Sequence, residues 1–324
     1  MHSYNDLLKK VETALAGQNF NLLPAELYEP IAYTFSLGGK RMRPVLTLMA
    51  CELFYGDIEK AVNPALGIEI FHNFTLLHDD IMDKAPLRRG KETVYQKWNT
   101  NIAILSGDTM FAMAYDYLIK TDIRLIPEIL SLFNLTARQV CEGQQYDMNF
   151  ETSSDVTIAD YINMIRLKTA VLPAAAMKTG AIIAEAEDKE AENIYRFGEN
   201  IGLAFQLKDD LLDVFGDEAT FGKHCGGDIA SNKKTFLYLK AFELATGNDL
   251  LALQHYFSGT YFDEKTKYRE VKHIYETLKI KDFAENEMDR YYRQSMDNLD
   301  AIAVEEERKS ELRQFAQQLL KRES

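Results

Sequence analysis

A five-residue acidic motif occurs twice in the chain, as DDIMD at Asp79–Asp83 and as DDLLD at Asp209–Asp213. Each copy follows a mostly apolar run, Phe71–Leu77 in the first case and Ile201–Leu207 in the second. In an α-helix, residues four apart share one face, so the first and last aspartates of each motif converge while the second turns away. Like charges one turn apart repel each other, and a bound cation would remove that cost. Each motif is therefore a candidate pair of metal ligands.

The identical spacing of the two copies favours a divalent-metal site over the simpler interpretation, a solvated acidic face. A solvated face is the usual explanation for single carboxylates in a chain with 50 Asp and Glu against 37 Lys and Arg. Carboxylate pairs with open coordination positions suit Mg²⁺, whose shell is typically completed by water and by phosphate oxygens of a substrate. The motifs therefore raise the question of where phosphate would bind.

Basic residues cluster beside the chain breaks around both motifs. Arg matches phosphate oxygens through paired hydrogen bonds, and Lys supplies an adaptable point charge. Any one of these cations is explained as well by a solvated side chain, but their placement beside the motifs favours phosphate binding. Two separable groups suggest two anions. The residues are Lys40, Arg41 and Arg43 in a Gly-Gly-Lys-Arg turn, Arg88 and Arg89 after the first motif, Lys168, and Lys223 and Lys233 after the second.

The elements that carry these residues are predicted to be helices. The chain has 324 residues, of which 46% are hydrophobic, with only 7 Pro and 17 Gly to interrupt regular structure. Apolar residues recur at the i, i+3, i+4 spacing of one helix face in segments 46–54, 102–118, 162–176 and 312–320. Residues 1–324 are therefore predicted to form a single all-α domain, a helical bundle with a sizeable core.

Charge and cysteine content argue against several kinds of partner and compartment. The net charge of −13 argues against nucleic acid, whose backbone requires a basic surface. The three cysteines, Cys51, Cys141 and Cys225, are widely separated and lack metal-ligand spacing, so we expect reduced thiols in a cytoplasmic protein. No apolar run reaches the length of a membrane span and Met1–Ala16 has no signal-peptide core, so stable membrane insertion is not expected.

The longest break in the sequence directly follows the second motif. Residues 216–227 contain four glycines, the acids Asp217 and Glu218, and Lys223. A segment of this composition beside a site is predicted to act as its lid. The repeated motif also suggests two similar halves, although no sustained sequence repeat accompanies it.

Together these segments resemble the signature motifs of the trans-isoprenyl diphosphate synthases, a family of prenyltransferases. The resemblance runs in order from about residue 31 to residue 240. It implies an all-helical fold around a deep central cavity and, usually, a homodimer. The matching segments are GGKRMRP at Gly38–Pro44, the first acidic motif with Arg88-Arg89-Gly90, Lys168-Thr169, FQLKDDLLD at Phe205–Asp213, and GKHCGGD at Gly222–Asp228 with Lys233.

The resemblance also implies a reaction and the residues that perform it. Such an enzyme joins isopentenyl diphosphate head-to-tail to an allylic diphosphate by Mg²⁺-assisted ionisation, condensation and loss of a proton. Three Mg²⁺ ions on the allylic diphosphate are assigned to Asp79, Asp83 and Asp209, with Asp80 and Asp213 in supporting roles. The same anion is assigned to Arg88, Lys168, Lys223 and Lys233. The metal-free isopentenyl diphosphate is assigned to Lys40, Arg43, His72 and Arg89.

An allylic carbocation forms in this reaction and must be kept from water. The side chains of Thr169 and Gln206 and the carbonyl of Lys168 are expected to stabilise it through oriented dipoles. The departed diphosphate is the expected base for the final proton. The segment Gly143–Asp147 resembles a helix of the family that faces the site, so Gln144 and Asp147 are expected to support these residues.

Product length is expected to depend on residues one or two turns before Asp79, because the growing chain runs beside that helix in the family. Phe71, Phe74 and Thr75 are the expected floor of the cavity. An aromatic residue five positions before the motif and a small residue four positions before it resemble the geranylgeranyl-type synthases. We therefore expect geranylgeranyl diphosphate, with farnesyl diphosphate or a longer polyprenyl diphosphate as alternatives.

Three other functions are compatible with parts of the sequence. A class I terpene cyclase shares the first motif, but its second metal motif mixes Asn, Ser and Glu. A di-iron carboxylate bundle would use the Glu-x-x-His pairs Glu69/His72 and Glu270/His273, and would leave the aspartate motifs without a role. A regulatory subunit of a heteromeric synthase would be expected to lack one motif, and both are present here.

Overall fold

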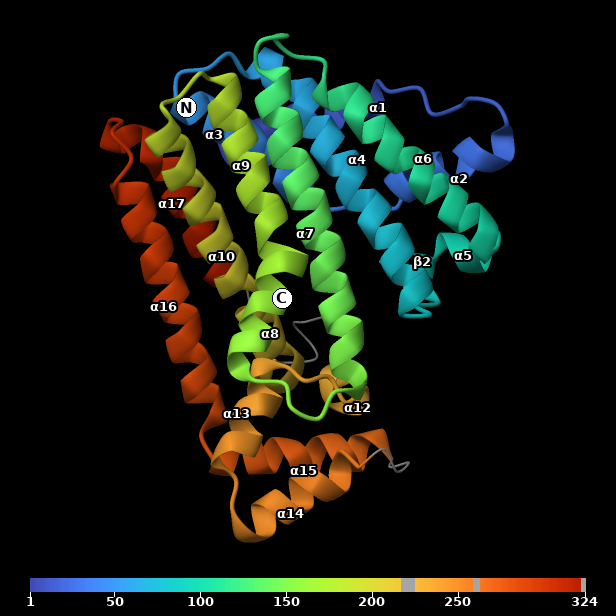
Figure 1. The fold of residues 1–324 in the computed structure, drawn as a ribbon, viewed down its shortest axis with the longest axis vertical. Coiled ribbons are helices and arrows are strands. Elements are labelled where there is room, and N and C mark those ends of the chain that lie inside the picture. Colours follow the sequence, from blue (N-terminus) through green and yellow to red (C-terminus); the bar gives the residue numbers. More distant parts are fainter. Residues whose placement is uncertain (217–224, 259–262, 322–324) are drawn as a thin grey trace. The chain divides into compact units, whose positions relative to one another are not determined.

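The protein is helical throughout the part that the structure describes. The structure is a computed structural model that describes residues 1–216, 225–258 and 263–321. In these residues the only strands are β1 (Leu87–Arg88) and β2 (Lys91–Glu92), which form one antiparallel hairpin after the long helix α4 (Figure 1). The prediction of an all-α fold is confirmed.

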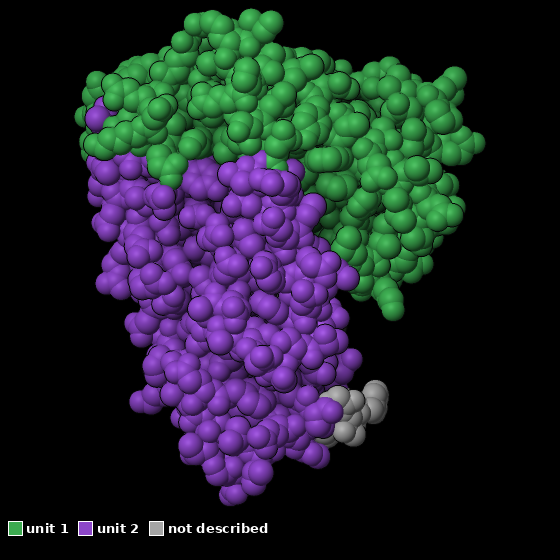
Figure 2. All heavy atoms as spheres, viewed as in Figure 1, with its two compact units in different colours: residues 1–134, 175–192, 304–311 green, residues 135–174, 193–303, 312–324 purple. Residues whose placement is uncertain are grey.

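The chain divides into two compact units, coloured separately in Figure 2. Unit 1 consists of residues 1–134, 175–192 and 304–311, and unit 2 consists of residues 135–174, 193–303 and 312–324. Four helices have residues in both units, α7 (Ile126–Thr152), α9 (Val171–Ile183), α10 (Asp188–Phe215) and α17 (Glu306–Lys321). The prediction of one domain over the whole chain stays a prediction.

Unit 1 is organised around one long helix that ends in the first acidic motif. Its helices are α1 (Tyr4–Ala16), α2 (Ala25–Ser36), α3 (Met42–Leu53), α4 (Ile58–Met82), α5 (Val94–Lys97) and α6 (Thr100–Leu118). Helix α4 packs against both α3 and α6. The contact with α6 requires Gly67, because a Cβ there would lie 2.9 Å from the carbonyl oxygen of Ala114. This close packing fixes the helix that carries Asp79–Asp83.

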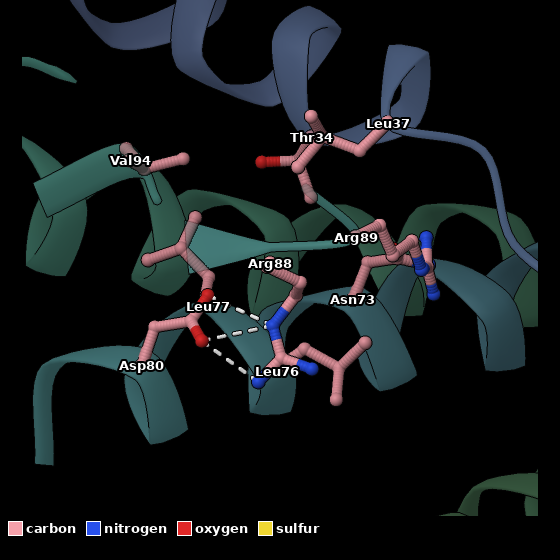
Figure 3. Close-up of a pocket in the computed structure, with 9 residues that line it drawn as sticks. All are labelled: Thr34, Leu37, Asn73, Leu76, Leu77, Asp80, Arg88, Arg89 and Val94. Carbon is pink, nitrogen blue, oxygen red and sulfur yellow. Dashed lines mark hydrogen bonds and ion pairs between the residues drawn. The ribbon is translucent and has the colours of Figure 1, made fainter. Parts of the chain in front are cut away.

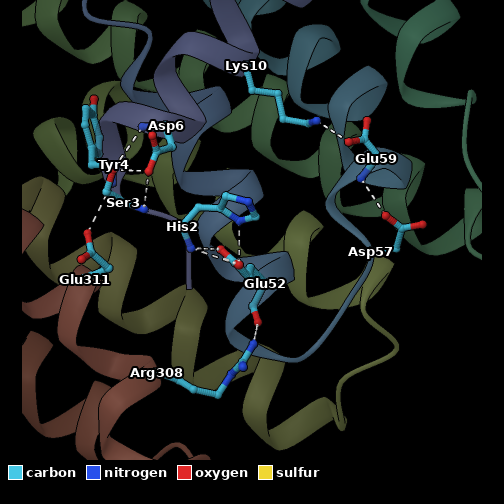
Figure 4. A network of polar contacts seen from close by, with 10 residues as sticks. All are labelled: His2, Ser3, Tyr4, Asp6, Lys10, Glu52, Asp57, Glu59, Arg308 and Glu311. Carbon is cyan, nitrogen blue, oxygen red and sulfur yellow. Dashed lines mark hydrogen bonds and ion pairs between the residues drawn. The ribbon is translucent and has the colours of Figure 1, made fainter.

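A polar network holds α3 of unit 1 in place (Figure 4). The ring of His2 pairs with Glu52 at 2.8 Å between Nδ1 and Oε1. Arg308 donates hydrogen bonds to the backbone carbonyls of Glu52 and Leu53, the second at 3.0 Å from Nε. The amide of Tyr4 donates to Glu311 at 3.3 Å. These contacts tie both the first residues and the start of α17 to α3, which follows the Gly-Gly-Lys-Arg turn.

Unit 2 packs its remaining helices around the C-terminal half of α10. These elements are α8 (Ile158–Ile165), the π-helix η1 (Arg166–Ala170), α12 (Gly227–Ala230), α13 (Phe236–Leu244), α14 (Gly247–Tyr256), α15 (Glu264–Thr277) and α16 (Ile280–Asp300). The apolar run before the second motif is buried in this core, with Leu203 at 3% and Leu207 at 1% exposure. Burial of one face of α10 leaves the other face to carry Asp209 and Asp213.

None of the helices in the described ranges is both long enough and apolar enough to cross a membrane.

Candidate active site

The first acidic motif lies at the C-terminal end of α4. Asp79 is in its last turn, and Asp83 directly follows the helix, donating its amide hydrogen bond to the carbonyl of Asp79 at 2.8 Å. The side chain of Asp79 is 23% exposed, Asp83 is exposed, and Asp80 is only 5% exposed. Solvent thus reaches the outer two aspartates, whereas the middle one is turned into the protein.

Arg88 holds the buried middle aspartate (Figure 3). Its Nε lies 2.8 and 2.9 Å from the two carboxylate oxygens of Asp80, and its Nη2 lies 2.7 Å from Oδ1. The same Nη2 is 3.7 Å from Oδ2 of Asp79. Burial raises the pKa of Asp80, and the hydrogen bonds from Arg88 oppose that shift. Arg88 therefore links the anchored aspartate to the more exposed one.

The β1–β2 hairpin positions two arginines differently. Arg88 pairs with Lys91 across the hairpin, so Arg89 and Gly90 form a two-residue turn with positive φ values of 54° and 75°. Figure 3 shows Arg89 directed away from Asp80. It donates a hydrogen bond to the carbonyl of Gly38, and a Cβ on Gly39 would lie 2.9 Å from its guanidinium nitrogens. Gly39 thus makes room for the Arg89 side chain.

His72 and Arg43 form a second contact near this turn. Nη1 of Arg43 lies 3.0 Å from Nε2 of His72. Burial, reinforced by Arg43 and Arg89, lowers the pKa of His72 well below its usual value, so the ring is neutral and can accept this hydrogen bond. Burial also lowers the pKa of Arg43 to about 10. Lys40 is exposed, and its carbonyl accepts a hydrogen bond from the Tyr4 hydroxyl at 3.3 Å.

Arg41 belongs to the core. Its Nη1 lies 2.9 Å from Oε1 of Glu69, and the two residues are 6% and 3% exposed. Asn73 donates to the same Glu69 oxygen at 3.1 Å. Because Glu69 is buried and paired with an arginine, it is not available as an iron ligand, which removes half of the di-iron alternative. His273, from the other Glu-x-x-His pair, is exposed on α15.

A small cavity lies beside the contact between Arg88 and Asp80. Its volume is about 10 Å³, comparable to one water molecule. It is lined by Thr34, Leu37, Asn73, Leu76, Leu77, Asp80, Arg88, Arg89 and Val94 (Figure 3). A cavity of this size is part of the packing beneath the hairpin and cannot hold a substrate.

The residues expected to limit product length lie in an aromatic cluster of unit 1. Phe71 is fully buried, and its ring lies 5.5 Å from that of Phe74 and 5.1 Å from that of Phe133. The ring of Phe74 is stacked on Phe111 of α6 at 5.3 Å. Thr75 donates its hydroxyl to the carbonyl of His72 at 2.8 Å. Sequence reasoning did not identify Phe111 and Phe133, because their contacts with α4 come from separate helices and have no local signal.

The second acidic motif lies within α10, and in the described part of the chain the hydrogen bonds to its middle residue come from neutral side chains. Asp209 and Asp213 are half-buried, and Asp210 is 4% exposed. The hydroxyl of Tyr161 donates to Oδ2 of Asp210, and Nε2 of Gln206 donates to Oδ1 at 3.1 Å. Burial raises the pKa of Asp210 well above its usual value, and repulsion from Asp228 adds to that shift. Sequence reasoning did not identify this contact of Tyr161 with the second motif.

Asp213 positions the segment that begins α12. The amide of Asp228 donates to Oδ2 of Asp213 at 3.0 Å, and the amide of Gly226 donates to its carbonyl at 2.6 Å. Gly226 has a φ of 91°, which glycine adopts without strain. Nζ of Lys233 lies 3.6 Å from Asp228, whose pKa burial and Asp213 raise to about 6. The Gly-x-Asp sequence is thus bound to the last residue of the second motif.

The π-helix η1 carries Lys168 and Thr169. A π-helical turn is rare and often lies at a functional site. Gly143 of α7 permits this backbone to approach, since a Cβ there would clash with the backbone of Leu167 and Lys168. Nζ of Lys168 lies 2.6 Å from Oδ2 of Asp147, and Gln144, three residues earlier on α7, is half-buried.

Thr169 is connected to the second motif through Gln206. Its hydroxyl lies 3.3 Å from Oε1 of Gln206, the same side chain that donates to Asp210. Lys223 and most of the expected lid at residues 216–227 lie outside the described residues.

The donor set of each motif fits Mg²⁺. The outer carboxylates offer hard oxygen ligands, and the described residues contain no group of three or more His, Cys, Asp or Glu side chains that could hold a metal ion. Mg²⁺ commonly takes one or two protein carboxylates and completes its shell with water and substrate phosphate. A pair of outer aspartates on each motif is therefore the kind of incomplete site that a phosphate-bearing substrate would complete.

A sequence model of the polyprenyl synthetase family matches residues 24–278, more than half of the chain. The chain belongs to the polyprenyl synthetase family. Members of this family are prenyltransferases that use isopentenyl diphosphate and an allylic diphosphate. The prediction of a prenyltransferase, made from the two motifs and their neighbours, is confirmed.

Polyprenyl synthetases similar to this chain include two archaeal enzymes. The geranylgeranyl diphosphate synthase of Methanosarcina mazei is 39% identical over 230 residues, which cover 70% of this chain and 71% of the relative. That of Sulfolobus acidocaldarius is 35% identical over 309 residues, covering 93% and 91%. A crystal structure of a geranylgeranyl pyrophosphate synthase matches this structure with a TM-score of 0.92 at 43% identity, covering 100% of both chains.

Proposed function

We propose that the protein is a geranylgeranyl diphosphate synthase, which condenses isopentenyl diphosphate head-to-tail with an allylic diphosphate. The observation that carries the proposal is the repeated arrangement of two outer aspartates with a buried, internally bonded middle one, at the ends of α4 and α10. The names of the relatives described above support the twenty-carbon product.

Mg²⁺ would be held by Asp79, Asp83 and Asp209, with Asp80 and Asp213 as supports. When bound, the ions would neutralise the diphosphate and assist its departure as Lewis acids. Asp80 supports Asp79 through Arg88, which contacts both carboxylates. Asp213 fixes the start of α12. We further propose three Mg²⁺ ions per active site, the number that the family resemblance implies.

The cations divide into two anion-binding sets. Arg88, Lys168, Lys223 and Lys233 are proposed to bind the allylic diphosphate, and Lys40, Arg43, His72 and Arg89 the isopentenyl diphosphate. Arg43 supports the second assignment, because its Nε is buried and has no hydrogen-bond partner within the described chain. A buried guanidinium N–H without an acceptor is costly, and a phosphate oxygen would satisfy it.

The carbocation is proposed to lie near Gln206, Thr169 and the carbonyl of Lys168. Their oxygens would face the developing positive charge in a site from which water is excluded. The π-helical turn supports the assignment, because it widens the helix where Lys168 and Thr169 stand. Gln144 and Asp147 would support Lys168, whose ammonium already lies against Asp147.

A homodimer is the proposed assembly, in the cytoplasm as the free cysteines suggest. Large apolar side chains are exposed on α6 of unit 1 and at its end, and a second copy would cover them. They are Ile104, Leu105 and Ile119. Sedimentation equilibrium should give twice the 37.1 kDa chain mass, and a monomer at micromolar concentration would contradict the assembly.

Incubation with Mg²⁺, isopentenyl diphosphate and farnesyl diphosphate tests the function. We expect one twenty-carbon diphosphate, identified by mass spectrometry after extraction. Products that stop at fifteen carbons from shorter primers, or that extend well beyond twenty, would contradict the proposed product length. They would still agree with a prenyltransferase of this family. No condensation with any allylic primer would contradict the function.

Phe74 is the proposed floor of the product cavity, supported by Phe71 and Thr75. Replacing Phe74 with Ala removes the ring that stacks on Phe111 and opens space in the cluster. We expect products longer than twenty carbons. The matched control is Phe133→Leu, which keeps Phe74 in place. Unchanged product length in Phe74→Ala would show that the floor lies elsewhere.

A further inference from the structure

Four side chains in unit 2 form a continuous chain of hydrogen bonds that starts at a tyrosine outside every predicted motif. Tyr161 of α8 donates its hydroxyl to Oδ2 of Asp210. Nε2 of Gln206 donates to the other carboxylate oxygen, Oδ1, at 3.1 Å. Oε1 of Gln206 lies 3.3 Å from the hydroxyl oxygen of Thr169. The chain thus runs from α8 through α10 to the π-helix.

Burial fixes the orientation of the side chains in this series of hydrogen bonds. Tyr161 is 2% exposed and Asp210 is 4% exposed, so solvent does not compete for the carboxylate. A carboxylate oxygen accepts the amide N–H₂ of a glutamine, which turns the amide carbonyl the opposite way. That carbonyl is the atom that meets Thr169. Tyr161 occupies the second carboxylate oxygen and fixes the plane of Asp210, so the orientation of Gln206 depends on it.

We propose that Tyr161 is a positioning residue, which orients Asp210 and, through it, the Gln206 carbonyl and the Thr169 hydroxyl toward the allylic carbocation. The inference rests on the proposed function. Its consequence concerns the fate of the cation. After the C–O bond breaks and its electron pair leaves with the diphosphate, the cation is consumed in one of two ways. Either the double bond of isopentenyl diphosphate forms a C–C bond and the resulting cation loses a proton to the departed diphosphate, or a water oxygen attacks and loses a proton to give an allylic alcohol.

Loss of the Tyr161 hydroxyl should favour the second fate. Without it, Asp210 and Gln206 can rotate, and water can replace their oriented oxygens beside the cation. A structural defect alone would lower the amount of active enzyme and leave the ratio of alcohol to elongated product unchanged. The ratio therefore separates positioning from stability.

The test is Tyr161→Phe, assayed with labelled farnesyl diphosphate, isopentenyl diphosphate and Mg²⁺, with farnesol and elongated product quantified together. We expect the ratio of alcohol to product to rise about tenfold, in keeping with the loss of one oriented contact. The matched control is Tyr275→Phe, which removes a tyrosine hydroxyl from the same core at 1% exposure. The Tyr275 hydroxyl makes no hydrogen bond in the part of the chain that the structure describes. Its ratio should equal the wild-type ratio.

A double-mutant cycle that combines Tyr161→Phe with Gln206→Met tests whether Tyr161 acts through Gln206. If Tyr161 acts through Gln206, adding Tyr161→Phe to Gln206→Met should leave the ratio within about twofold of the single Gln206 variant. A further tenfold rise would mean that Tyr161 acts by another route and would overturn the proposal. An unchanged ratio in Tyr161→Phe would also overturn it. If the wild-type protein makes no elongated product, the proposed function itself is wrong. That result differs from the two outcomes that would overturn only the role of Tyr161.

Discussion

The two acidic motifs have the same aspartate spacing, but the structure anchors their middle residues in opposite ways. Asp80 is bound by the guanidinium of Arg88, which also reaches Asp79. Asp210 is bound by the neutral side chains of Tyr161 and Gln206, and its pKa is raised well above the usual value. A repeated sequence motif therefore does not imply a repeated electrostatic environment.

This difference separates two ways of supporting outer carboxylates. At the first motif, a cation compensates the buried charge and remains close to the exposed carboxylate. At the second, hydrogen bonds fix a buried carboxyl whose charge is disfavoured, and the same bonds lead to Thr169. The first arrangement keeps a cation beside the outer carboxylate, and the second fixes the orientation of neutral polar side chains.

Removing the cation from the first motif should cost the most stability. Arg88→Met leaves Asp80 buried without its partner, and breaking such a pair costs about 3 kcal/mol of unfolding free energy. Chemical denaturation at pH 7.5 measures the loss, with Arg88→Lys as a control that keeps the charge. A loss below about 1 kcal/mol would mean that water reaches Asp80 and that the pair is not an anchor.

The pH dependence of stability should follow His72. Because its pKa is well below the usual 6.5 in the folded protein, the unfolded chain binds the extra proton as the pH falls below 6.5. Folding stability should therefore fall with decreasing pH by about 1.4 kcal/mol per pH unit for this one group. His72→Gln keeps an acceptor for Arg43 but cannot bind the proton. The wild type should therefore lose about 2 kcal/mol more unfolding free energy than this variant between pH 6.5 and pH 5. Parallel pH profiles for the variant and the wild type would contradict the neutral ring.

Exchanging each middle aspartate for Asn should reveal the contrast directly. Asp210→Asn replaces a carboxyl of raised pKa with an uncharged amide, whose N–H₂ can donate to Gln206 once that side chain turns its carbonyl toward it, so we expect a change below about 1 kcal/mol in unfolding free energy. Asp80→Asn removes the carboxylate that Arg88 binds and should cost about 2 kcal/mol.

The sign of the pH effect adds a second check on the same pair of variants. Since the folded pKa of Asp210 lies above the unfolded one, wild-type stability falls as pH rises through that window, and Asp210→Asn removes this loss. Equal costs for both variants at pH 7.5, measured by urea denaturation, would contradict the distinction between the two motifs.

The smallest effect is expected at the ion pair between Lys168 and Asp147. Both side chains are partly exposed, at 26% and 29%, so solvent screens the pair. Asp147→Asn should lower the unfolding free energy by about 0.5 kcal/mol, and 1 M salt should remove most of the difference. A salt-independent loss above about 2 kcal/mol would show that this pair is a structural anchor like Asp80 and Arg88.

Sequence predicts the parts of this arrangement that depend on local spacing. The helical period predicts that Asp79 and Asp83 share a face and that Asp80 turns inward, and the structure buries Asp80 at the end of α4 while the outer two remain more exposed. The sequence predicts that Arg88 and Arg89 lie beside a chain break after the first motif, but the hairpin that directs Arg88 at Asp80 has only two residues per strand and too weak a pattern to predict. Tyr161 could not be found, because its contact with Asp210 joins residues 49 positions apart. The π-helix could not be predicted either, because its backbone packs against Gly143 of a separate helix, and local sequence carries no signal of that contact.

The central claim is that both acidic motifs act on one Mg²⁺-bound diphosphate. It is tested most directly by the rate of twenty-carbon product formation in Asp79→Ala, in Asp209→Ala and in the double variant. We expect each single variant to lose at least about 100-fold and the double variant to lose little more, because residues that act as a unit are not additive. Wild-type turnover in either single variant, or losses that multiply in the double variant, would contradict the claim.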